Sequence, residues 1–514
     1  MKKESKSRRS KFYITTAIDY ANASPHMGHA YEKICADAIA RWHRFKGEDV
    51  FFLTGTDENA QKNVQAAGEA GVEVEKFVDD NSRKFINLCG ALNLSHDDFI
   101  RTTESRHKEV SQAIFAKLYE KGDIYKGFYE GHYCEGCEAF ITEKELIKGE
   151  CPEHNLKPKL IKEESYFFKL AKYQKDILKL LEEGLVEPET RKNEIVNRVR
   201  DGLKDLSVSR KNLDWGIAVP FDSDHKIYVW IDALINYISA LGWPDGEKFK
   251  KYWPTDLHLI GKGINWFHSV IWPAILMSAG IELPKKIFVH GYLTIEGRKI
   301  SKSLGNAVDP TPFIEEYGVD PIRYFLMRDV SFGQDGDFSR EAFIQRYNGD
   351  LANDLGNLLN RTLTMIEKYF KGLIPPGGEE LGADEDLLNF ARGLHKKLDT
   401  SMAGLDINRS LETIWELINK ANKYIEDSKP WELFKGDKRR LEVVIYNLAE
   451  VLRLVLLSIR SFIPKTAENM LKQLDPSSAI EQAGFDDLAA WGKLKAGTKI
   501  SKGSPLFPRI QKEQ

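Results

Sequence analysis

Two short polar segments, far apart in the chain, carry side chains suited to binding phosphate. The first is His26-Met27-Gly28-His29, and the second is Lys299-Ile300-Ser301-Lys302-Ser303. Imidazole and ammonium groups donate hydrogen bonds to phosphate oxygens, and a glycine lets a ligand approach the backbone closely. The two lysines are mobile cations that can follow the charge developing on a transferring phosphoryl group. We therefore expect both segments to belong to one nucleotide site.

Each segment follows a run that predicts a β-strand. Phe12 to Ile18 is an apolar run before His26, and Lys286 to His290 precedes the second segment. A helical pattern begins at Ala30, so its positive N-terminal dipole points at the same anion. The β-α-β order predicts a parallel sheet, and phosphates bind at the carboxyl edge of such sheets.

The pattern of strands and helices divides the chain into five segments. Residues 1–11 read as a flexible basic tail, 12–125 and 225–347 as two halves of a nucleotide-binding catalytic domain, 126–224 as an inserted module, and 348–514 as a helix bundle. Further strands are expected at Val50–Leu53, Ile227–Trp230 and Leu257–Ile260. Four or five amphipathic helices are expected in the bundle, including Asp384–Leu405, Asn408–Ile425 and Lys438–Phe462.

The inserted module contains a pattern typical of a zinc site. Cys134-x-x-Cys137 is followed by Cys151-x-x-His154, which gives two closely spaced pairs of ligands. Four such ligands close a tetrahedral site and leave no open position, so the Zn²⁺ would be structural. A metal-free knuckle with unpaired thiols is the alternative. The predicted fold is thus α/β: a Rossmann-like parallel sheet split by an inserted zinc-knuckle module, followed by an all-α helix bundle.

Composition sets limits on the function. The 514 residues allow about three domains, and the 42% hydrophobic and 29% charged content is ordinary for a soluble globular protein. No apolar run reaches the roughly 20 residues needed to span a membrane, and residues 1–11 lack the apolar region of a secretory signal. The net charge of −3 means that any nucleic-acid surface must be local. We expect a cytoplasmic protein.

The order, spacing and strand context of the two polar segments resemble class I aminoacyl-tRNA synthetases. His26–His29 matches the HIGH motif of that class, and Lys299–Ser303 matches its KMSKS motif with Ile300 in place of Met. The resemblance implies that the two motifs sandwich ATP, with its Mg²⁺, and stabilise the transition state of amino-acid adenylation. It further implies that His26 and His29 bind the phosphates, Gly28 underlies the adenine, and Lys299 and Lys302 hold the leaving pyrophosphate.

Other segments resemble the methionyl-tRNA synthetase family in particular. Ala17–Asn22 is similar to a Tyr-containing run before the family's HIGH motif, Val229–Ala233 resembles its VWxDA segment, and Gly261–Ala274 resembles its GKD…FH…WPA stretch. The resemblance runs from Phe12 into the helical part. It implies a ligase that activates L-methionine with ATP and transfers it to the 3′-terminal ribose of tRNA(Met). Since the chain ends before the appended module that some members carry, a monomer is expected.

The resemblance also implies a methionine pocket. A thioether is polarizable and packs well on aromatic rings. Asp57 matches the carboxylate that holds the α-ammonium, and Tyr20 and His268 are candidates for hydrogen bonding to sulfur. An ordinary apolar core is the alternative for each aromatic residue. The matching positions are Ala17, Ile18, Tyr20, Asp57, Trp230, Ala233, Tyr237, Ile264, Phe267, His268 and Trp272.

Two departures from the family pattern occur near this pocket. The usual GTDEHG reads Gly55 to Ala60 here, with Asn59-Ala60 in place of His-Gly, and Gly263 replaces the Asp of GKD. We expect altered hydrogen bonding around the site rather than lost chemistry.

Three residues of the helical part match the family's binding site for the CAU anticodon. Asn357 and Arg361 are four apart and share a helix face, and Trp431 follows Lys429-Pro430 at a helix break. An exposed Trp stacks an unpaired base, worth about 1–3 kcal/mol, while Asn and Arg read base edges. Without the resemblance, a helix-surface hydrogen bond and a packed interhelical Trp are the preferred interpretations.

Three other functions remain as alternatives. A cysteinyl synthetase uses an active-site zinc, whereas the Cys cluster here falls in the inserted module. A non-catalytic tRNA-binding paralogue does not explain the intact His26, His29, Lys299 and Lys302. A nucleotidyltransferase with an HxGH turn does not explain the helical end.

Overall fold

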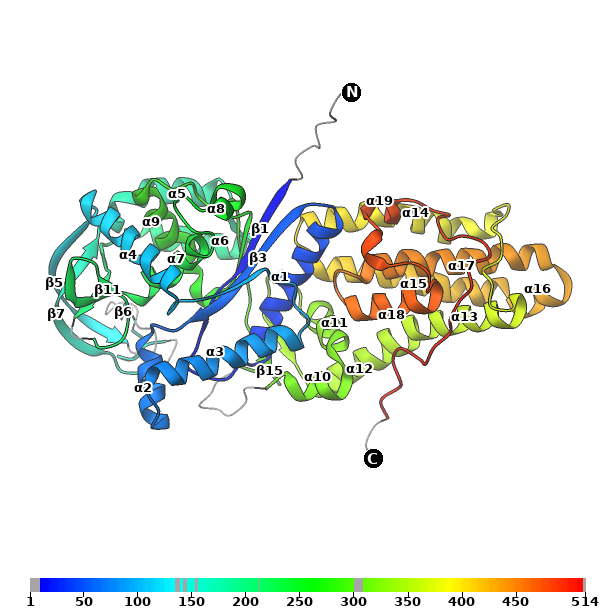
Figure 1. Ribbon diagram of the computed structural model, residues 1–514, viewed down its shortest axis with the longest axis horizontal. Helices are drawn as coiled ribbons and strands as arrows, with labels where there is room; N and C mark the ends of the chain where they lie inside the picture. The colour runs from blue at the N-terminus through cyan, green and yellow to red at the C-terminus, as the bar shows by residue number, and fades with distance from the viewer. Residues whose placement is uncertain are drawn as a thin grey trace, which may run out of the picture.

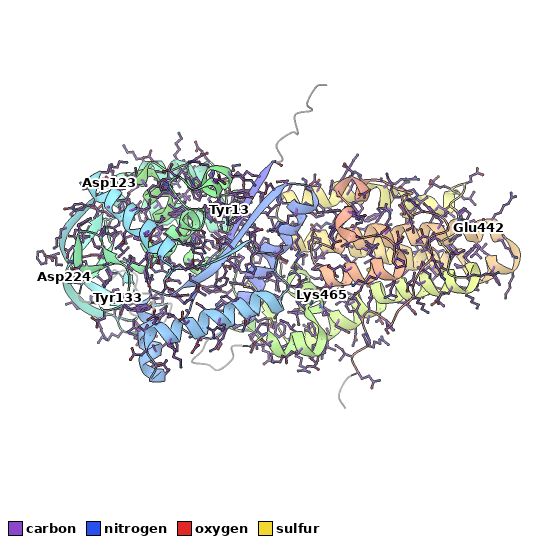
Figure 2. All side chains as sticks on the ribbon, viewed as in Figure 1. Tyr13, Asp123, Tyr133, Asp224, Glu442 and Lys465 are labelled. Atoms are coloured by element: carbon purple, nitrogen blue, oxygen red, sulfur yellow. The ribbon has the colours of Figure 1, made fainter. Side chains whose placement is uncertain are left out.

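The computed structural model describes residues 10–134, 139–141, 146–152, 156–211, 213–299 and 308–511. An α/β half and a helical half lie end to end, with helix α1 (Met27–Phe45) near their junction (Figure 1). Tyr13 lies within the α/β half and Glu442 near the far end of the helical half (Figure 2). Within the described ranges, no helix is long and apolar enough to cross a membrane.

The centre of the α/β half is a seven-stranded parallel sheet. Its carboxyl edge collects the segments that follow each strand, because all strands run the same way. In the register, Ile14 lies opposite both Phe52 and Leu257. The strand order is β2 (Asp19–Tyr20), β3 (Asp49–Asp57), β1 (Lys11–Thr16), β13 (Leu257–Gly261), β14 (Ile287–His290) and β8 (Val186–Glu187), with β4 (Asp98–Arg101) beside β3.

Both faces of this sheet are buried, which explains its nearly continuous apolar strands. Ile14 and Phe52 pack on one side in a core shared with α1 and the helical half. Tyr13 and Phe51 point to the other side, into a core shared with α4 (Ser105–Glu120) and α7 (Val229–Ser239). The predicted Rossmann-like sheet is confirmed, as is its position before a helical part.

The segment between the two sheet halves contains a separate four-stranded antiparallel sheet. Its main hairpin pairs β5 (Ile124–Cys134) with β7 (Lys159–Phe168), joined by β6 (Ala139–Ile141) and β9 (Leu206–Ser207). Strand β8, from the same stretch of chain, instead forms the edge of the parallel sheet beside β14. Helices α5 (Gln174–Glu182) and α6 (Glu189–Arg200) flank β8 in the sequence. The limits 126–224 remain a prediction.

The expected strand at Ile227–Trp230 was wrong. Strand β12 (Asp222–Ile227) ends where that run begins, Tyr228 caps the next helix, and α7 starts at Val229. A short apolar run fits a buried strand and a buried helix equally well. All eleven residues of α7 are buried, including its polar residues Asp232, Asn236 and Ser239.

The helical half is a bundle whose helices begin and end close to the predicted limits. Its long members are α13 (Asn357–Phe370), α14 (Glu385–Ala403), α15 (Ile407–Ser428) and α17 (Lys438–Ile459), followed by α18 (Pro464–Leu474). The short helix α16 (Pro430–Gly436) starts after Lys429, which adopts φ 44°, so the chain turns sharply there.

A fully buried ion pair joins the two halves. Arg323, on α11 (Val319–Asp329), places Nη2 2.7 Å from Asp37 Oδ2 on α1. The same guanidinium donates to the carbonyls of Phe462, before α18, and Leu92, after α3 (Val74–Ala91). One side chain thus fixes the position of α1 relative to the bundle.

We predict that Arg323→Met lowers the free energy of unfolding by about 3–5 kcal/mol, because the change leaves Asp37 buried with one cation fewer. The matched control is Arg340→Met, whose pair with Glu316 is about half exposed, and this change costs less than about 1 kcal/mol. Urea denaturation followed by tryptophan fluorescence measures both. Equal losses in the two variants would contradict the assigned role of Arg323.

Candidate active site

The His26–His29 turn forms the first turn of α1, just beyond the carboxyl end of β1. Two reciprocal hydrogen bonds hold it: Gly28 N–H donates to His26 Nδ1 at 3.1 Å, and His26 N–H donates to His29 Nδ1 at 3.0 Å. The two rings lie with centroids 3.8 Å apart. Both imidazoles therefore serve as helix caps through Nδ1 and present Nε2 to the surroundings.

These hydrogen bonds also fix the protonation of the two histidines. Since Nδ1 accepts in each ring, the neutral imidazole carries its proton on Nε2. Burial, together with the neighbouring imidazole for His26 and Lys33 for His29, lowers the pKa of both rings to about 3. At neutral pH the turn thus offers two uncharged Nε2–H donors.

A residue that follows the second polar segment in the sequence, Val308, lies next to this turn. Met27 N–H donates to the carbonyl of Val308 at 2.9 Å, and Val308 follows the Lys299–Ser303 segment closely. Lys299 ends strand β16 (Arg298–Lys299), which pairs with β15 (Leu293–Ile295) after β14. The side chain of Lys299, and Lys302 itself, lie outside the described residues.

Most of the expected methionine-pocket residues come together in one cluster. Tyr20 and Trp230 meet edge to face at 6.0 Å, and Trp230 stacks on Phe267 at 3.6 Å. Asp57 is 2% exposed and lies opposite Tyr20 in the register of β2 and β3. Other expected members pack into or against the same core: Ala17, Ile18, Tyr237, Ile264, His268 and Trp272. Ala233, on α7, is buried.

His268 uses both ring nitrogens within the protein. Burial lowers its pKa to about 4, and its Nδ1–H donates to the carbonyl of Ile264 at 3.0 Å. Its Nε2 therefore accepts from the hydroxyl of Tyr237 at 2.7 Å. Both ring nitrogens of His268 are thus engaged within the protein, and the ring holds Tyr237 in place. A hydrogen bond from His268 to sulfur stays a prediction.

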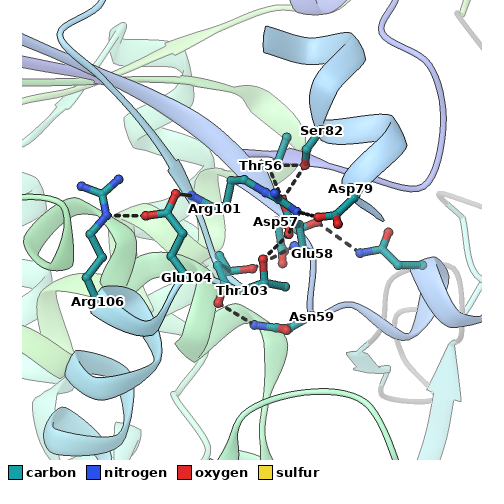
Figure 3. A network of polar contacts seen from close by, with 12 residues as sticks. Thr56, Asp57, Glu58, Asn59, Asp79, Ser82, Arg101, Thr103, Glu104 and Arg106 are labelled. Carbon is teal, nitrogen blue, oxygen red and sulfur yellow. Dashed lines mark hydrogen bonds and ion pairs between the residues drawn. The ribbon is translucent and has the colours of Figure 1, made fainter. Parts of the chain in front are cut away.

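The end of β3 is fixed by a buried polar network (Figure 3). Glu58 is fully buried, and its carboxylate accepts from Arg101 Nε and Nη2 at 2.7 and 2.9 Å. Three hydroxyls, of Thr56, Ser82 and Thr103, donate to the same carboxylate. Every lone pair of this carboxylate is occupied, so it acts as a rigid support beside Asp57.

The first family departure, Asn59, keeps a hydrogen bond across the site. Its amide donates to Asp232 Oδ2 at 2.8 Å and to the carbonyl of Thr102 at 3.1 Å. Asp232 Oδ1 lies 2.7 Å from His107 Nε2 on α4, and all these side chains are buried. Asn59 thus ties the end of β3 to α7, and the expected change in hydrogen bonding relative to the family stays a prediction.

At the second departure, Gly263, a neighbouring side chain leaves no room for a larger residue. A Cβ at this position would lie 2.3 Å from the hydroxyl oxygen of Tyr292. Lys262 pairs instead with Asp335, at 2.6 and 2.8 Å, over the ring of Tyr292. The carboxylate beside Lys262 thus comes from a distant part of the chain.

The three expected anticodon residues lie on neighbouring elements of the bundle. Asn357 is exposed at the start of α13, and Arg361 Nη1 lies 2.7 Å from Glu426 Oε1 near the end of α15. Trp431, in α16, is 40% exposed. Phe434 of α16 stacks on Tyr369 of α13 at 4.5 Å, which holds the two helices together.

The structure describes two of the four expected metal ligands. Cys134, at the end of β5, and Cys151 are both buried. Cys137 and His154 lie outside the described residues, and no group of three or more potential ligands occurs among those that are described.

Comparisons with known proteins agree with this geometry. A family model described as tRNA synthetases class I (M) matches residues 12–159 and 154–363, and one for the anticodon binding domain of methionyl tRNA ligase matches 374–514. The methionine–tRNA ligases of Caldanaerobacter subterraneus subsp. tengcongensis and Thermotoga maritima are 50% and 49% identical, over 98% and 97% of this chain and 79% and 80% of theirs. The chain belongs to the methionyl-tRNA synthetase family.

Solved structures of the family match the fold closely. The Mycobacterium tuberculosis methionyl-tRNA synthetase in complex with methionyl-adenylate has a TM-score of 0.94 and 44% identity, covering 97% of this chain and all of that chain. Its apo form has a TM-score of 0.87. The resemblance to methionyl-tRNA synthetases drawn from the sequence is confirmed; the roles of single residues stay predictions.

Sequence patterns missed several buried polar residues around the site. Asp19 and Lys33 form a buried ion pair beneath the turn, and Glu32 bonds His290 on β14 at 2.8 Å. His107 joins Asp232 from a distant helix. The helical face of α1 gave one usable signal, since Lys33 lies one turn after His29 on a helix that is otherwise apolar there.

The depressed pKa of His268 predicts a pH dependence of stability. The pKa of His268 is about 4 in the folded chain and near 6.5 in the unfolded chain. Between about pH 4 and pH 6.5, His268 is therefore protonated in the unfolded chain and neutral in the folded chain. The contribution of His268 to the free energy of unfolding is therefore fully present above pH 6.5. It falls as the pH drops through this range, by up to about 1.4 kcal/mol per pH unit. Urea denaturation should show a shallower fall for His268→Gln; parallel curves would contradict the assignment.

Proposed function

We propose that the His26–His29 turn and the lysines at 299 and 302 form the adenylation site of this chain. The activity itself follows from family membership: the chain activates L-methionine with ATP and transfers it to tRNA. The main support for this site is the hydrogen bond from Met27 N–H to the carbonyl of Val308. It holds Val308, which follows the lysine segment in the sequence, against the histidine turn.

In the first step, a carboxylate oxygen of methionine attacks the α-phosphorus of Mg-ATP. The bond between that phosphorus and the bridging oxygen breaks, giving methionyl-adenylate and pyrophosphate. His26 and His29 donate through Nε2–H to phosphate oxygens without adding charge, and Gly28 lets the adenine lie close to the backbone. Lys299 and Lys302 neutralise the pyrophosphate that leaves. Catalysis comes from positioning and charge stabilisation, with no covalent enzyme intermediate.

In the second step, a hydroxyl of the 3′-terminal ribose of tRNA(Met) attacks the adenylate carbonyl and releases AMP. Following the pattern of this class of enzymes, we assign the attack to the 2′-OH. No residue of this chain needs to bond to the methionyl group.

Methionine selection rests on the aromatic cluster. Trp230, stacked on Phe267, and Tyr20, edge-on to Trp230, supply aromatic rings on which an unbranched thioether packs well. Asp57, buried at the end of β3, provides the counter-charge for the α-ammonium. The hydrogen bond between Tyr237 and His268 fixes the far wall. Ala17, Ile18, Ala233, Ile264 and Trp272 complete the pocket.

Anticodon recognition is proposed for Asn357, Arg361 and Trp431. Trp431 is exposed, as a stacking platform must be, and Arg361 lies at the same corner of the bundle. Glu426 holds Arg361 in the free protein, but its side chain is 59% exposed, so a base of the CAU anticodon displaces it at little cost.

A structural Zn²⁺ is proposed for Cys134, Cys137, Cys151 and His154. The two described thiols support it, since both are buried and thiolates are strong zinc ligands. The metal would crosslink the tip of the β5–β7 hairpin and take no part in the reaction. This position in the antiparallel module distinguishes the chain from an enzyme that selects a thiol substrate by an active-site zinc. We further propose a cytoplasmic monomer.

The adenylation step is tested by Lys302→Ala. We expect methionine-dependent ATP–pyrophosphate exchange to fall by at least about 100-fold, while methionine binding changes little, because Lys302 contacts charge that develops in the transition state. A similar string, Lys499–Gly503 near the end of the chain, supplies the control, Lys502→Ala, which should exchange normally. Exchange with all twenty amino acids should proceed with methionine alone. Wild-type exchange in Lys302→Ala would refute its role.

The anticodon assignment is tested by Trp431→Ala, which removes the stacking platform. We expect kcat/KM for aminoacylation of tRNA(Met) to fall by about 5-fold to 100-fold, with pyrophosphate exchange unchanged. Trp431→Phe should retain most of the activity, and Trp491→Ala, elsewhere in the bundle, serves as the matched control. If Trp431→Ala and Trp491→Ala aminoacylate alike, the proposed site is wrong.

A further inference from the structure

The ion pair of Asp19 and Lys33 lies directly beneath the histidine turn. Lys33 is fully buried and its Nζ contacts Asp19 Oδ2, while Asp19 Oδ1 lies 3.8 Å from His29 Nε2. Burying two charges removes both from water, and replacing such a pair by apolar residues of similar volume is often neutral or stabilising. Its presence beside the turn therefore needs a reason other than stability.

The carboxylate of Asp19 faces the one proton that His29 can donate. At 3.8 Å the two groups attract each other but are too far apart for a hydrogen bond. The opposite nitrogen of His29 is held by His26 N–H, and its ring packs edge-on against Phe85 of α3 at 5.2 Å. The ring is thus aimed, and an incoming phosphate oxygen can take the Nε2–H without breaking an existing hydrogen bond.

A carboxylate in this position would by itself repel the nucleotide. The phosphates that His29 binds must lie within hydrogen-bond reach of Nε2, and hence only a few ångströms from Asp19. In a partly buried site such repulsion is weakly screened. Lys33 removes the problem, since its ammonium contacts the same carboxylate from the protein side.

We propose that Asp19 and Lys33 are a positioning pair for adenylation, in which Asp19 orients the Nε2–H of His29 and Lys33 cancels the charge of Asp19 towards ATP. The inference rests on the proposed role of the histidine turn in binding phosphate. Lys33 is fully buried and Asp19 is 8% exposed, so both act through His29.

The surroundings of Asp19 predict how a loss of Lys33 depends on pH. The groups facing Asp19 are His26, His29 and Lys33 around the start of α1 and Cys89 on α3, while its register neighbour on β3 is the uncharged Thr56. Burial raises the pKa of Asp19, and Lys33 opposes that rise. Without Lys33 the pKa rises further, so Asp19 takes up a proton as the pH falls and its repulsion of ATP disappears.

Two variants separate positioning from structure: Lys33→Met, and the charge-free double variant Asp19→Asn/Lys33→Met. In methionine-dependent ATP–pyrophosphate exchange at about pH 8, we expect Lys33→Met to raise the KM for ATP at least about 10-fold, with the KM for methionine within about 2-fold. At about pH 6 the KM for ATP should return towards the wild-type value. The double variant should restore the KM for ATP while kcat falls about 10-fold, because His29 is no longer aimed.

The matched control is Asp384→Asn/Arg440→Met, which removes a buried pair of the bundle and should lower thermal stability without changing the KM for ATP. The proposal is overturned if the double variant is as impaired in ATP binding as Lys33→Met, or if Lys33→Met raises both KM values equally. If Lys33→Met does not fold, wild-type kcat in the double variant overturns it.

His29→Asn distinguishes this inference from the function on which it rests. Wild-type exchange in His29→Asn refutes the proposed phosphate role of the turn. If His29→Asn loses exchange while both pair variants keep wild-type kinetics, the positioning role of Asp19 and Lys33 is refuted and the phosphate role of the turn stands.

Discussion

Two hydrogen bonds at the start of α1, from Gly28 N–H to His26 Nδ1 and from His26 N–H to His29 Nδ1, determine the chemistry of the proposed adenylation site. They occupy Nδ1 of each ring, so the protons lie on Nε2 and face away from the helix. Because burial also lowers the pKa of both rings, we propose that the turn binds phosphate through neutral donors. Positive charge is left to the lysines of the second segment. This division suits a site in which charge must follow the departing pyrophosphate.

Other buried polar groups keep the same edge of the sheet rigid. The carboxylate of Glu58, at the end of β3, accepts from Arg101 and three hydroxyls. Asp232 on α7 bonds Asn59 and His107. Asp19 pairs with Lys33. Each carboxylate is costly to bury, and each lies beside a residue proposed to touch substrate. Stability in the rest of the chain comes from two apolar cores, one on each face of the sheet, and from Arg323 at the junction with the bundle.

Sequence patterns predicted helices and strands well where the pattern was periodic. They predicted the candidate site only in part. Strand β14 and the long bundle helices lie close to their predicted limits, since alternation and helical period are properties of neighbouring residues. The run at Ile227–Trp230, expected to be a strand, leads into α7, because a short apolar run fits a buried strand and a buried helix equally well. Motifs located His26, His29 and Trp230. Partners brought in by tertiary structure, such as His107 on Asp232 or Tyr292 against Gly263, leave no trace in local spacing.

The state of the two histidines is the most direct test of this account. Nitrogen chemical shifts of selectively labelled histidine, assigned by His26→Gln and His29→Gln, report the tautomer and charge of each ring. We predict that both rings are neutral and carry the proton on Nε2, with no change between pH 8 and about pH 5. A titration of either ring near pH 6.5, or a proton on Nδ1, would contradict the reciprocal caps and the neutral donation that follows from them.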